Sequence, residues 1–325
     1  ENGLCMPQLT AKKYQLTFIA GVTMKVDDIN FKFFYINKWD NGEFKGDAIS
    51  TTSELVKISS DGNLGLQEGQ KFERGGIYRF TVDVTKGNTK AVLTVEKVGK
   101  VDLPAPDIFF GNSKMEVTDT DIYKSDQVFT RGQMITVTGI DNLNEWWIDP
   151  DFFEKQSDGT LKFLPINGDY RVTANGILKY FSVIALKDGK PAKLQDDGTG
   201  AIWAIGKGIG KPSVTSSEVG WETGKALCLA QVAPKKYQLT LKAGETLKTS
   251  GDWEAISFKF FYQNDWGGEF SNYASNTLVE QLKLTGSGNL EMQDNKAFEE
   301  GGVYRFTIDV TNGNANAILK VEKIN

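Results

Sequence analysis

The chain has 325 residues, of which 40% are hydrophobic and 24% charged, a composition typical of globular domains. Its formal net charge of −5 makes a polyanion such as nucleic acid an unfavourable partner. The sequence contains no apolar run of about 18 residues or more that would span a membrane. It also contains no histidine, which excludes Ser-His-Asp and Cys-His catalysis and histidine-ligated zinc.

Taken in chain order, the sequence contains one region twice. The segment Lys12–Thr17 returns unchanged at Lys235–Thr240, and Gly75–Thr85 returns with small changes at Gly301–Thr311. Matching segments in the same order indicate a duplicated domain. Both copies alternate apolar and polar residues with period two, and turn-forming residues separate these runs. We therefore expect an all-β fold of tandem antiparallel β-sandwich domains, of the immunoglobulin-like or carbohydrate-binding-module kind.

Three domains are predicted, at 1–101, 102–198 and 199–325. Leu103–Pro106 contains two prolines and is expected to be a stiff linker. The middle segment is interpreted as a diverged sandwich, because its Gly-x-Tyr-Arg-x-Thr pattern resembles both flanking copies.

The last domain opens with an apolar strand at 202–206 that has no equivalent before Leu4. Either the first domain has lost this strand or the strand lies upstream of residue 1. We favour the second alternative, because a sandwich that lacks a strand exposes an edge and part of its core.

An aromatic strand followed by a tryptophan-containing loop occurs in both copies. Phe31–Tyr35 leads to Trp39 in the first copy, and Phe258–Tyr262 leads to Trp266 in the second. A tryptophan in a loop rich in glycine and asparagine is only partly buried, and its flat apolar face can stack on a sugar ring. The alternative is a tryptophan that caps the core of the sandwich. Further tryptophans in loops of the last domain are candidates for an aromatic clamp: Trp221 and Trp253.

Polar side chains accompany these aromatic residues. Lys32 and Lys259 lie between phenylalanines that should point into the core, so each amine should point outward and can donate hydrogen bonds to hydroxyl groups. Asn63, Asn264 and Asn289 offer both a donor and an acceptor, which suits sugar hydroxyls. The alternatives are solvated lysines on a sheet and plain turn asparagines.

The sequence gives no sign of a catalytic or metal site. Glycoside hydrolysis requires two carboxylates that face each other across a cleft, whereas Asp265 and Glu269 share one loop. Cys5 and Cys228 occupy equivalent positions in separate domains, so we expect two buried, unpaired thiols. We predict no catalytic residue, no metal ligand and no cofactor.

The last domain resembles the carbohydrate-binding modules of SusE/SusF-type proteins, which are outer-membrane glycan-binding lipoproteins of Bacteroidetes polysaccharide-utilisation systems. The resemblance depends on an ordered set of segments and covers about 201–325, and 1–100 without the leading strand. These segments are Ile205-Gly206, Gly220-Trp221, Phe258-Lys259-Phe260 with Trp266, Gly288-Asn289-Leu290 and Gly302-Val303-Tyr304.

The resemblance implies a ligand face of stacking tryptophans beside basic and amide residues. Phe261 stands where starch-binding members tend to have arginine, which argues against starch. The binding residues that the resemblance and the repeat imply are Trp221, Lys259, Trp266 and Asn289, with Lys32, Trp39 and Asn63 in the first copy.

We therefore expect a monomeric, non-catalytic protein that binds a polysaccharide or oligosaccharide at the bacterial cell surface, as an accessory to a glycan uptake system. A lipid anchor upstream of residue 1 would hold it at the outer membrane, with other outer-membrane glycan-uptake proteins as further partners. The alternatives are a structural or adhesive surface protein with sandwich domains as spacers, and a glycoside hydrolase.

Overall fold

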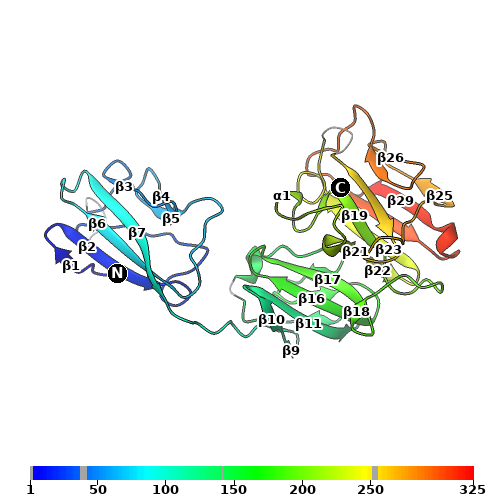
Figure 1. Cartoon of the computed structure of the whole chain (residues 1–325), viewed down its shortest axis with the longest axis horizontal. Coiled ribbons are helices and arrows are strands. Elements are labelled where there is room, and N and C mark those ends of the chain that lie inside the picture. Colours follow the sequence, from blue (N-terminus) through cyan, green and yellow to red (C-terminus); the bar gives the residue numbers. More distant parts are fainter. Residues whose placement is uncertain (1–2, 37–41, 141, 251–254) are drawn as a thin grey trace. The chain divides into compact units, whose positions relative to one another are not determined.

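The computed structural model describes residues 3–36, 42–140, 142–250 and 255–325. The chain forms two compact units, Glu1–Pro104 and Ala105–Asn325 (Figure 1). Both are built of β-strands in mainly antiparallel sheets, which confirms the prediction of an all-β sandwich-type fold. Within the described ranges, no helix has the length and apolar character that a membrane crossing requires. The division between the units falls inside the proline-containing segment 103–106.

The first unit packs a five-stranded sheet against a smaller layer. The central strand β6 alternates between buried and half-buried residues, so that one of its faces lines the core. The smaller layer is the hairpin of β4 (Val56–Ile58) and β5 (Leu64–Leu66), with Phe31 bridged to Leu64. The large sheet has the order β1 (Gln8–Thr10), β2 (Lys13–Ile19), β6 (Gly76–Asp83), β7 (Ala91–Lys100) and β3 (Ile49–Thr51).

The C-terminal part of the second unit repeats this plan. Its β25 lies parallel to β29, as β3 lies parallel to β7 in the first unit. One sheet has the order β22 (Ala230–Ala233), β23 (Lys236–Lys242), β28 (Val303–Asp309), β29 (Ile318–Lys323) and β25 (Ser275–Thr277). The facing sheet has the order β20 (Glu218–Gly220), β19 (Trp203–Gly210), β24 (Ser257–Phe261), β27 (Leu290–Met292) and β26 (Leu282–Leu284), and β21 (Leu227–Cys228) also pairs with β19.

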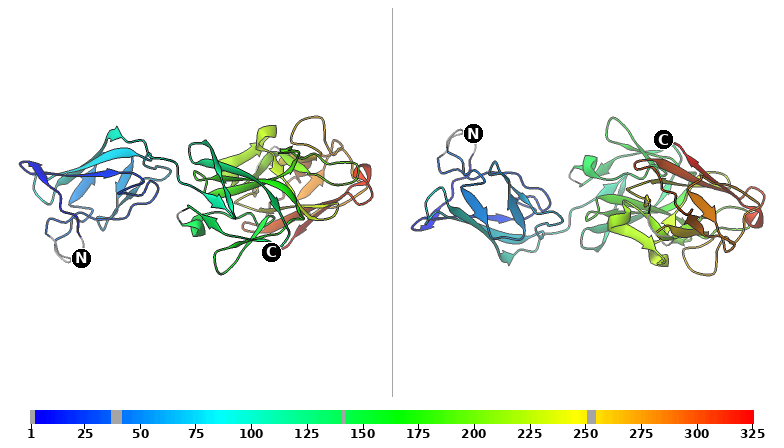
Figure 2. Two further views of the ribbon diagram at one scale, coloured as in Figure 1. Left: turned by 90° about the horizontal axis from the view of Figure 1, so that it is seen from below. Right: turned by 90° about the horizontal axis from the view of Figure 1, so that it is seen from above.

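The middle part of the second unit has its own core beneath a related sheet (Figure 2). The fifth strand of this sheet pairs antiparallel with its neighbour, whereas β25 and β3 pair parallel with theirs. The sheet has the order β10 (Glu116–Asp119), β11 (Ile122–Phe129), β16 (Gly168–Asn175), β17 (Tyr180–Lys187) and β18 (Lys190–Pro191). Two small sheets complete it: β12 (Met134–Ile135), β15 (Leu161–Phe163) and β14 (Phe153–Lys155); and β13 (Val137–Thr138), β8 (Phe109–Phe110) and β9 (Ser113–Lys114).

The helical elements are single turns that connect the strands. In the described part of the chain they lie in the second unit, at the ends of its strands. They are η1 (Leu143–Glu145), α1 (Val214–Ser217), η2 (Thr223–Lys225) and η3 (Asn314–Asn316).

Strand β19 distinguishes the two copies. It pairs with β24 from Trp203 opposite Phe261 to Lys207 opposite Ser257. Gly206 has φ +142°, and a Cβ atom there would lie 2.3 Å from the Cα of Phe258, so this close approach requires glycine. Beneath β19 the core is closed, and Phe258 is fully buried. Among the described residues of the first unit no strand corresponds to β19, and the equivalent phenylalanine, Phe31, is only half-buried.

The same difference corrects the prediction that both cysteines are buried. Both thiols are free, but only Cys228 is buried, whereas Cys5 is exposed. Cys228 pairs with Trp203 of β19, so this strand and its neighbours cover the thiol. Cys5 occupies the equivalent position in the copy where no described strand corresponds to β19.

We expect Phe258→Ala to destabilise its unit more than Phe31→Ala destabilises the first unit. A fully buried phenylalanine leaves a cavity when truncated, at a cost of about 3–5 kcal/mol. Phe31 already retains contact with solvent, so its truncation should cost roughly half as much. Hydrogen exchange measured by mass spectrometry on peptides from each unit would give the two free energies of opening separately. Equal losses would contradict the view that β19 closes only the second core.

Candidate ligand-binding surface

Two tryptophans from different loops form a flat aromatic surface, which we call the indole shelf. Trp221 directly follows β20 and is half-buried, whereas Trp266 lies in the loop after β24 and is 49% exposed. Their ring centroids lie 6.2 Å apart and their planes are inclined by 27°, which is an offset, nearly parallel arrangement. The buried ring of Phe261 supports Trp266 edge-on, with the centroids 5.8 Å apart. The two indoles are therefore neighbours, and the exposed one rests on a buried ring.

Short-range hydrogen bonds fix the loop that carries Trp266. The carboxylate of Asp265 accepts from the backbone N–H of Trp266 at 2.8 Å, and Nε2 of Gln263 donates to the carbonyl of Trp266 at 2.7 Å. The carboxylate of Asp265 therefore helps to hold this loop in place. These bonds fix the backbone of Trp266, while Phe261 and Trp221 contact its ring.

Strand register brings the predicted polar residues beside the shelf. Phe258 of β24 pairs with Leu290 of β27, so the next positions, Lys259 and Asn289, lie side by side on the opposite face of the sheet from Phe258. Lys259 also pairs with Ile205. Gly220, which directly precedes Trp221, pairs with Gly206 on the same strand, so the backbone at Trp221 lies next to this part of β19.

Lys259 and Asn289 keep their hydrogen-bonding groups available. Both side chains are half-buried. Within the described ranges, Lys259 forms no ion pair and the amide of Asn289 forms no hydrogen bond; only the backbone N–H of Asn289 is engaged, with the hydroxyl of Thr285 at 3.0 Å. An amine and an amide therefore face solvent beside an aromatic shelf.

The equivalent surface of the first unit is different. Phe31 bridges to Leu64, which places Lys32 beside Asn63 as in the second copy. However, the amine of Lys32 forms an ion pair with Glu43 at 3.3 Å, and both side chains are largely buried. Trp39 lies outside the described residues, as does Trp253 of the last domain.

A cavity of about 340 Å³ lies in the second unit, between the middle sheet and the C-terminal sandwich. Its walls come from β16 and β17 on one side and from β19 and the segment after Trp221 on the other. Thr223 lies two residues after Trp221, and Asn264 lies two residues before Trp266, so the cavity adjoins the indole shelf. Polar residues that line it include Thr173, Asn175, Tyr180, Ser182, Thr223 and Asn264.

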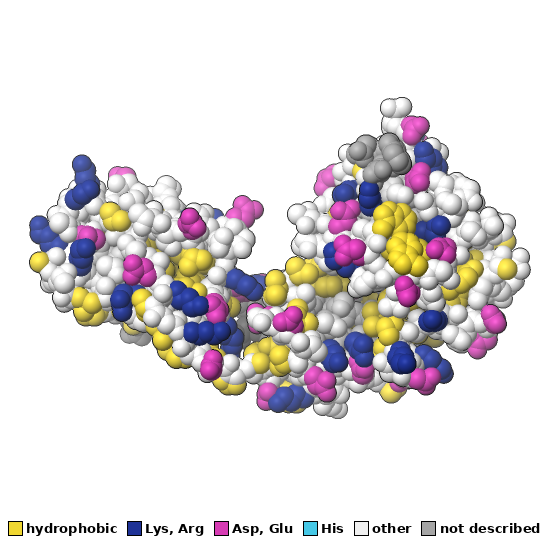
Figure 3. Space-filling model, viewed as in Figure 1, with side chains coloured by type: hydrophobic (Ala, Val, Ile, Leu, Met, Phe, Trp, Pro, Cys, Tyr) yellow, Lys and Arg dark blue, Asp and Glu magenta, His cyan; other side chains and the backbone are white. Residues whose placement is uncertain are grey.

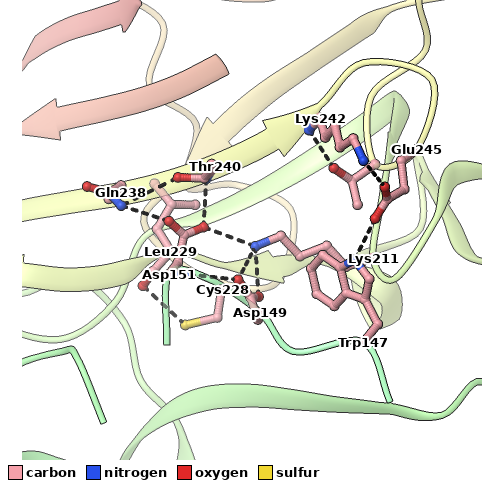
Figure 4. Close-up of polar contacts among 11 residues, drawn as sticks. Trp147, Asp149, Asp151, Lys211, Cys228, Leu229, Gln238, Thr240, Lys242 and Glu245 are labelled. Carbon is pink, nitrogen blue, oxygen red and sulfur yellow. Dashed lines mark hydrogen bonds and ion pairs between the residues drawn. The ribbon is translucent and has the colours of Figure 1, made fainter. Parts of the chain in front are cut away.

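A buried ion triad borders this cavity and joins the two parts of the second unit (Figure 4). Lys211 directly follows β19, and its amine contacts both carboxylate oxygens of Asp149 at 2.7 and 2.8 Å and Asp151 at 3.1 Å. All three side chains are at most 3% exposed. Asp151 also accepts from the amide of Gln238 at 2.8 Å and from the backbone N–H of Thr240 at 2.6 Å.

Burial and hydrogen bonding shift the pKa values of this triad in different directions. Burial raises the pKa of Asp149, although Lys211 opposes the shift. Burial also acts against the charged form of Asp151, but Lys211, Gln238 and Thr240 together hold its pKa below the ordinary value. Burial opposes the charge on Lys211 too, yet the two carboxylates outweigh it and raise its pKa. The triad therefore contains a charged lysine whose donors are already engaged.

A second contact beside the triad also joins the middle part to the C-terminal part. Nε1 of Trp147 donates to the carboxylate of Glu245 at 2.6 Å, and the amine of Lys211 lies 5.9 Å from the centroid of the Trp147 ring. Trp146, its neighbour, is buried in the middle core, because adjacent residues of an extended backbone point to opposite sides.

The acidic side chains of the described residues are not grouped for metal binding. In that part of the chain, no group of three or more cysteine and carboxylate side chains is placed to hold a metal ion. Asp149 and Asp151 are close together, but Lys211 bridges them and both are buried. On the face shown in Figure 3, acidic and basic side chains are interspersed.

Sequence reasoning identified the shelf but missed the cavity and the triad. Among the residues that line the cavity, Asn264 is the one that the sequence analysis had named as suited to sugar hydroxyls, because its amide can donate and accept hydrogen bonds. Asp149 and Lys211 are separated by about sixty positions, and no local pattern links them. The local signal at Lys211 is its place directly after an apolar strand and before a proline.

Comparison with protein families matches two family models to the chain, which overlap at residues 68–85. A family model described as a domain of unknown function (DUF5121) matches residues 1–85 and 197–311. A second, described as a domain of unknown function (DUF5125), matches residues 68–194. A search of curated proteins found no match. The first family therefore covers both duplicated copies, and the second covers the middle part.

We expect Lys211→Met to destabilise the second unit by about 3–5 kcal/mol at neutral pH, because it leaves two buried carboxylates without their cation. The carboxylates would then take up protons more readily, so the loss should shrink as the pH falls towards 5. Urea denaturation at pH 8 and pH 5 measures this change. The control is Lys225→Met, which removes an exposed ion pair with Glu222 and should change stability by less than about 1 kcal/mol. A loss that is independent of pH would contradict the electrostatic role.

Proposed function

The chain belongs to the DUF5121 family, whose domain it contains twice, and we propose that it binds a polysaccharide or oligosaccharide without chemically changing it. The indole shelf of the second copy carries this proposal. Two nearly parallel indoles, one of them half exposed, offer a flat apolar surface of the kind on which the C–H face of a sugar ring stacks.

Polar groups beside the shelf would fix the orientation of a stacked sugar ring, which stacking alone does not fix. The amine of Lys259 and the amide of Asn289 can donate to and accept from sugar hydroxyls, and neither is engaged by another described side chain. Concave or flat aromatic surfaces with a few such polar groups are typical of small-molecule sites. The combination suits a sugar, which has an apolar face and hydroxyl groups at its edge.

The two copies are proposed to differ in binding. Lys32 is neutralised by Glu43, so its amine is not free to meet a ligand as that of Lys259 is. We therefore assign the main site to the second copy. Further weak sites on the same chain would raise avidity for a polymer if their spacing matched its repeat.

The resemblance of the second copy to SusE/SusF-type modules supports a place at the bacterial cell surface. We propose that the protein is a monomeric accessory of a glycan uptake system, held at the outer membrane by a lipid anchor. Other glycan-uptake proteins of that membrane would be its protein partners. No cofactor or catalytic residue enters this proposal.

A spacer or adhesive role is the second candidate. The observation that favours it is the buried triad, which fastens the middle part to the C-terminal part. A rigid spacer does not require an exposed indole, however, and Trp266 would then be an unused apolar side chain. A glycoside hydrolase is less well supported, because the neighbouring carboxylate Asp265 serves its own loop.

We expect Trp266→Ala to abolish retention of the glycan that the parent chain binds in affinity electrophoresis. The probes are starch, xyloglucan, arabinoxylan, galactomannan and yeast mannan, each cast into the gel. The matched control is Phe109→Ala, which removes another exposed aromatic residue, from the middle part. If Trp266→Ala migrates like the parent in every retaining gel, the shelf is not the binding surface. If the parent is retained by no glycan in a wider panel, the binding function itself is wrong.

The two lysines provide an internal comparison. Lys259→Met should weaken binding of the retained glycan about fivefold or more, because a hydrogen bond from a charged donor is lost. Lys32→Met should leave the affinity unchanged, because its amine is already paired with Glu43. Isothermal titration calorimetry with an oligosaccharide from the retained polymer measures both. Equal effects of the two substitutions would show that both copies bind, and would contradict the assignment to the second.

A further inference from the structure

We propose that the cavity between the middle sheet and the C-terminal sandwich is a second subsite, which takes the terminal neutral sugar of a glycan chain or branch. This inference rests on the proposed function, because the remainder of the glycan would lie on the indole shelf. It assigns a binding role to the packing of the two family domains against each other, beyond either domain alone.

The cavity lies close to the shelf along the chain. The segments that carry the two indoles continue directly into its wall, at Thr223 after Trp221 and at Asn264 before Trp266. Two residues span at most about 7 Å. A chain that leaves the shelf can therefore enter the cavity within one or two sugar units.

Size limits the occupant to a small group. The volume of about 340 Å³ lies at the lower end of the range for ligand cavities, roughly 300–1,000 Å³. The cavity is bordered by Lys211 and Asp149, both buried and engaged with each other. A space of this size favours the end of a chain over a longer internal segment.

The chemistry of the wall matches sugar hydroxyls. Thr173 pairs with Ser182, and Asn175 pairs with Tyr180, so these four side chains lie on one face of the β16–β17 ladder. The hydroxyls of Thr173 and Ser182 form no hydrogen bond with other described residues, nor does the amide of Asn264 from the opposite wall. Each can donate and accept, as a sugar hydroxyl requires.

The apolar part of the wall is fixed in place. Nε1 of Trp203 donates to the carbonyl of Ala192 at 3.0 Å, which holds the indole in a buried position. Leu178 and Leu227 add apolar surface from the two sides. A mixed wall of this kind binds an amphipathic ring better than a purely polar or a purely apolar group.

The cations at the cavity are already engaged by carboxylates. Lys211 contacts two carboxylates, and Lys225 forms an ion pair with Glu222 at 3.0 Å. No described cation in the wall is left to attract an anionic ligand. The cavity therefore favours a neutral sugar over a uronic acid or a sulfated sugar.

The test uses the full chain labelled with 5-fluorotryptophan and observed by fluorine NMR. Its seven tryptophans are assigned through single Trp→Phe variants, and Trp203 is assigned by elimination if its own variant does not fold. The probes are the methyl glycosides of glucose, galactose, mannose, xylose and N-acetylglucosamine, with methyl glucuronide as the anionic comparison. At least one neutral glycoside should shift the Trp203 resonance, and the glucuronide should not.

Substitutions then locate the effect. Ser182→Phe fills the cavity and should abolish the Trp203 shift, whereas Thr138→Phe, on the exposed β13, should not. Thr173→Val keeps the shape but removes a hydroxyl, and should weaken glycoside binding about fivefold. A Trp203 resonance that responds to none of the glycosides overturns the subsite, even if Trp266→Ala abolishes polymer retention. Loss of polymer retention in Ser182→Phe with no glycoside effect on Trp203 also counts against it.

Discussion

The strand β19 and the lysine that follows it determine most of what is distinctive in this protein. One face of the strand closes the core of the second copy, where Phe258 is fully buried. The strand also carries Trp203, which reaches the middle part through the carbonyl of Ala192. Immediately after it, Lys211 enters the triad with Asp149 and Asp151. A single segment therefore completes a sandwich and also fixes that sandwich against its neighbour.

The triad contributes more to the specific packing of the two parts than to the net stability of the second unit. Desolvating three charges is costly, and the attraction among them in a buried site repays that cost only when the hydrogen bonds are complete. Here they are, because Gln238 and the backbone of Thr240 satisfy Asp151 while Lys211 occupies both oxygens of Asp149. A different packing of the two parts would leave these groups unpaired. The cavity keeps its shape because competing arrangements are penalised in this way.

Sequence reasoning succeeded where the signal was local and failed where it depended on packing. The exact repeat of Lys12–Thr17 and the period-two runs were enough for the fold, and strand alternation was enough to place Lys259 on the outer face. The exposure of Cys5 depends on a neighbouring strand, so equivalence with Cys228 was misleading. The cavity and the triad join residues far apart in the sequence, and no motif within one domain could reveal them.

The two copies show how a duplicated domain can keep its fold and change its surface. Both retain the lysine between two phenylalanines and the asparagine beside it, because strand register fixes those positions. In the first copy Glu43 engages the lysine, and Phe31 is only half-buried where no described strand corresponds to β19. In the second copy the strand is present, the lysine is unengaged and Trp221 directly follows β20, which pairs with that strand. The unengaged amine thus occurs in the copy that has β19, the strand that pairs with β20 and β24, which precede the two tryptophans of the shelf. A binding surface on this fold therefore depends on the supporting strand as well as on the residues that touch the ligand.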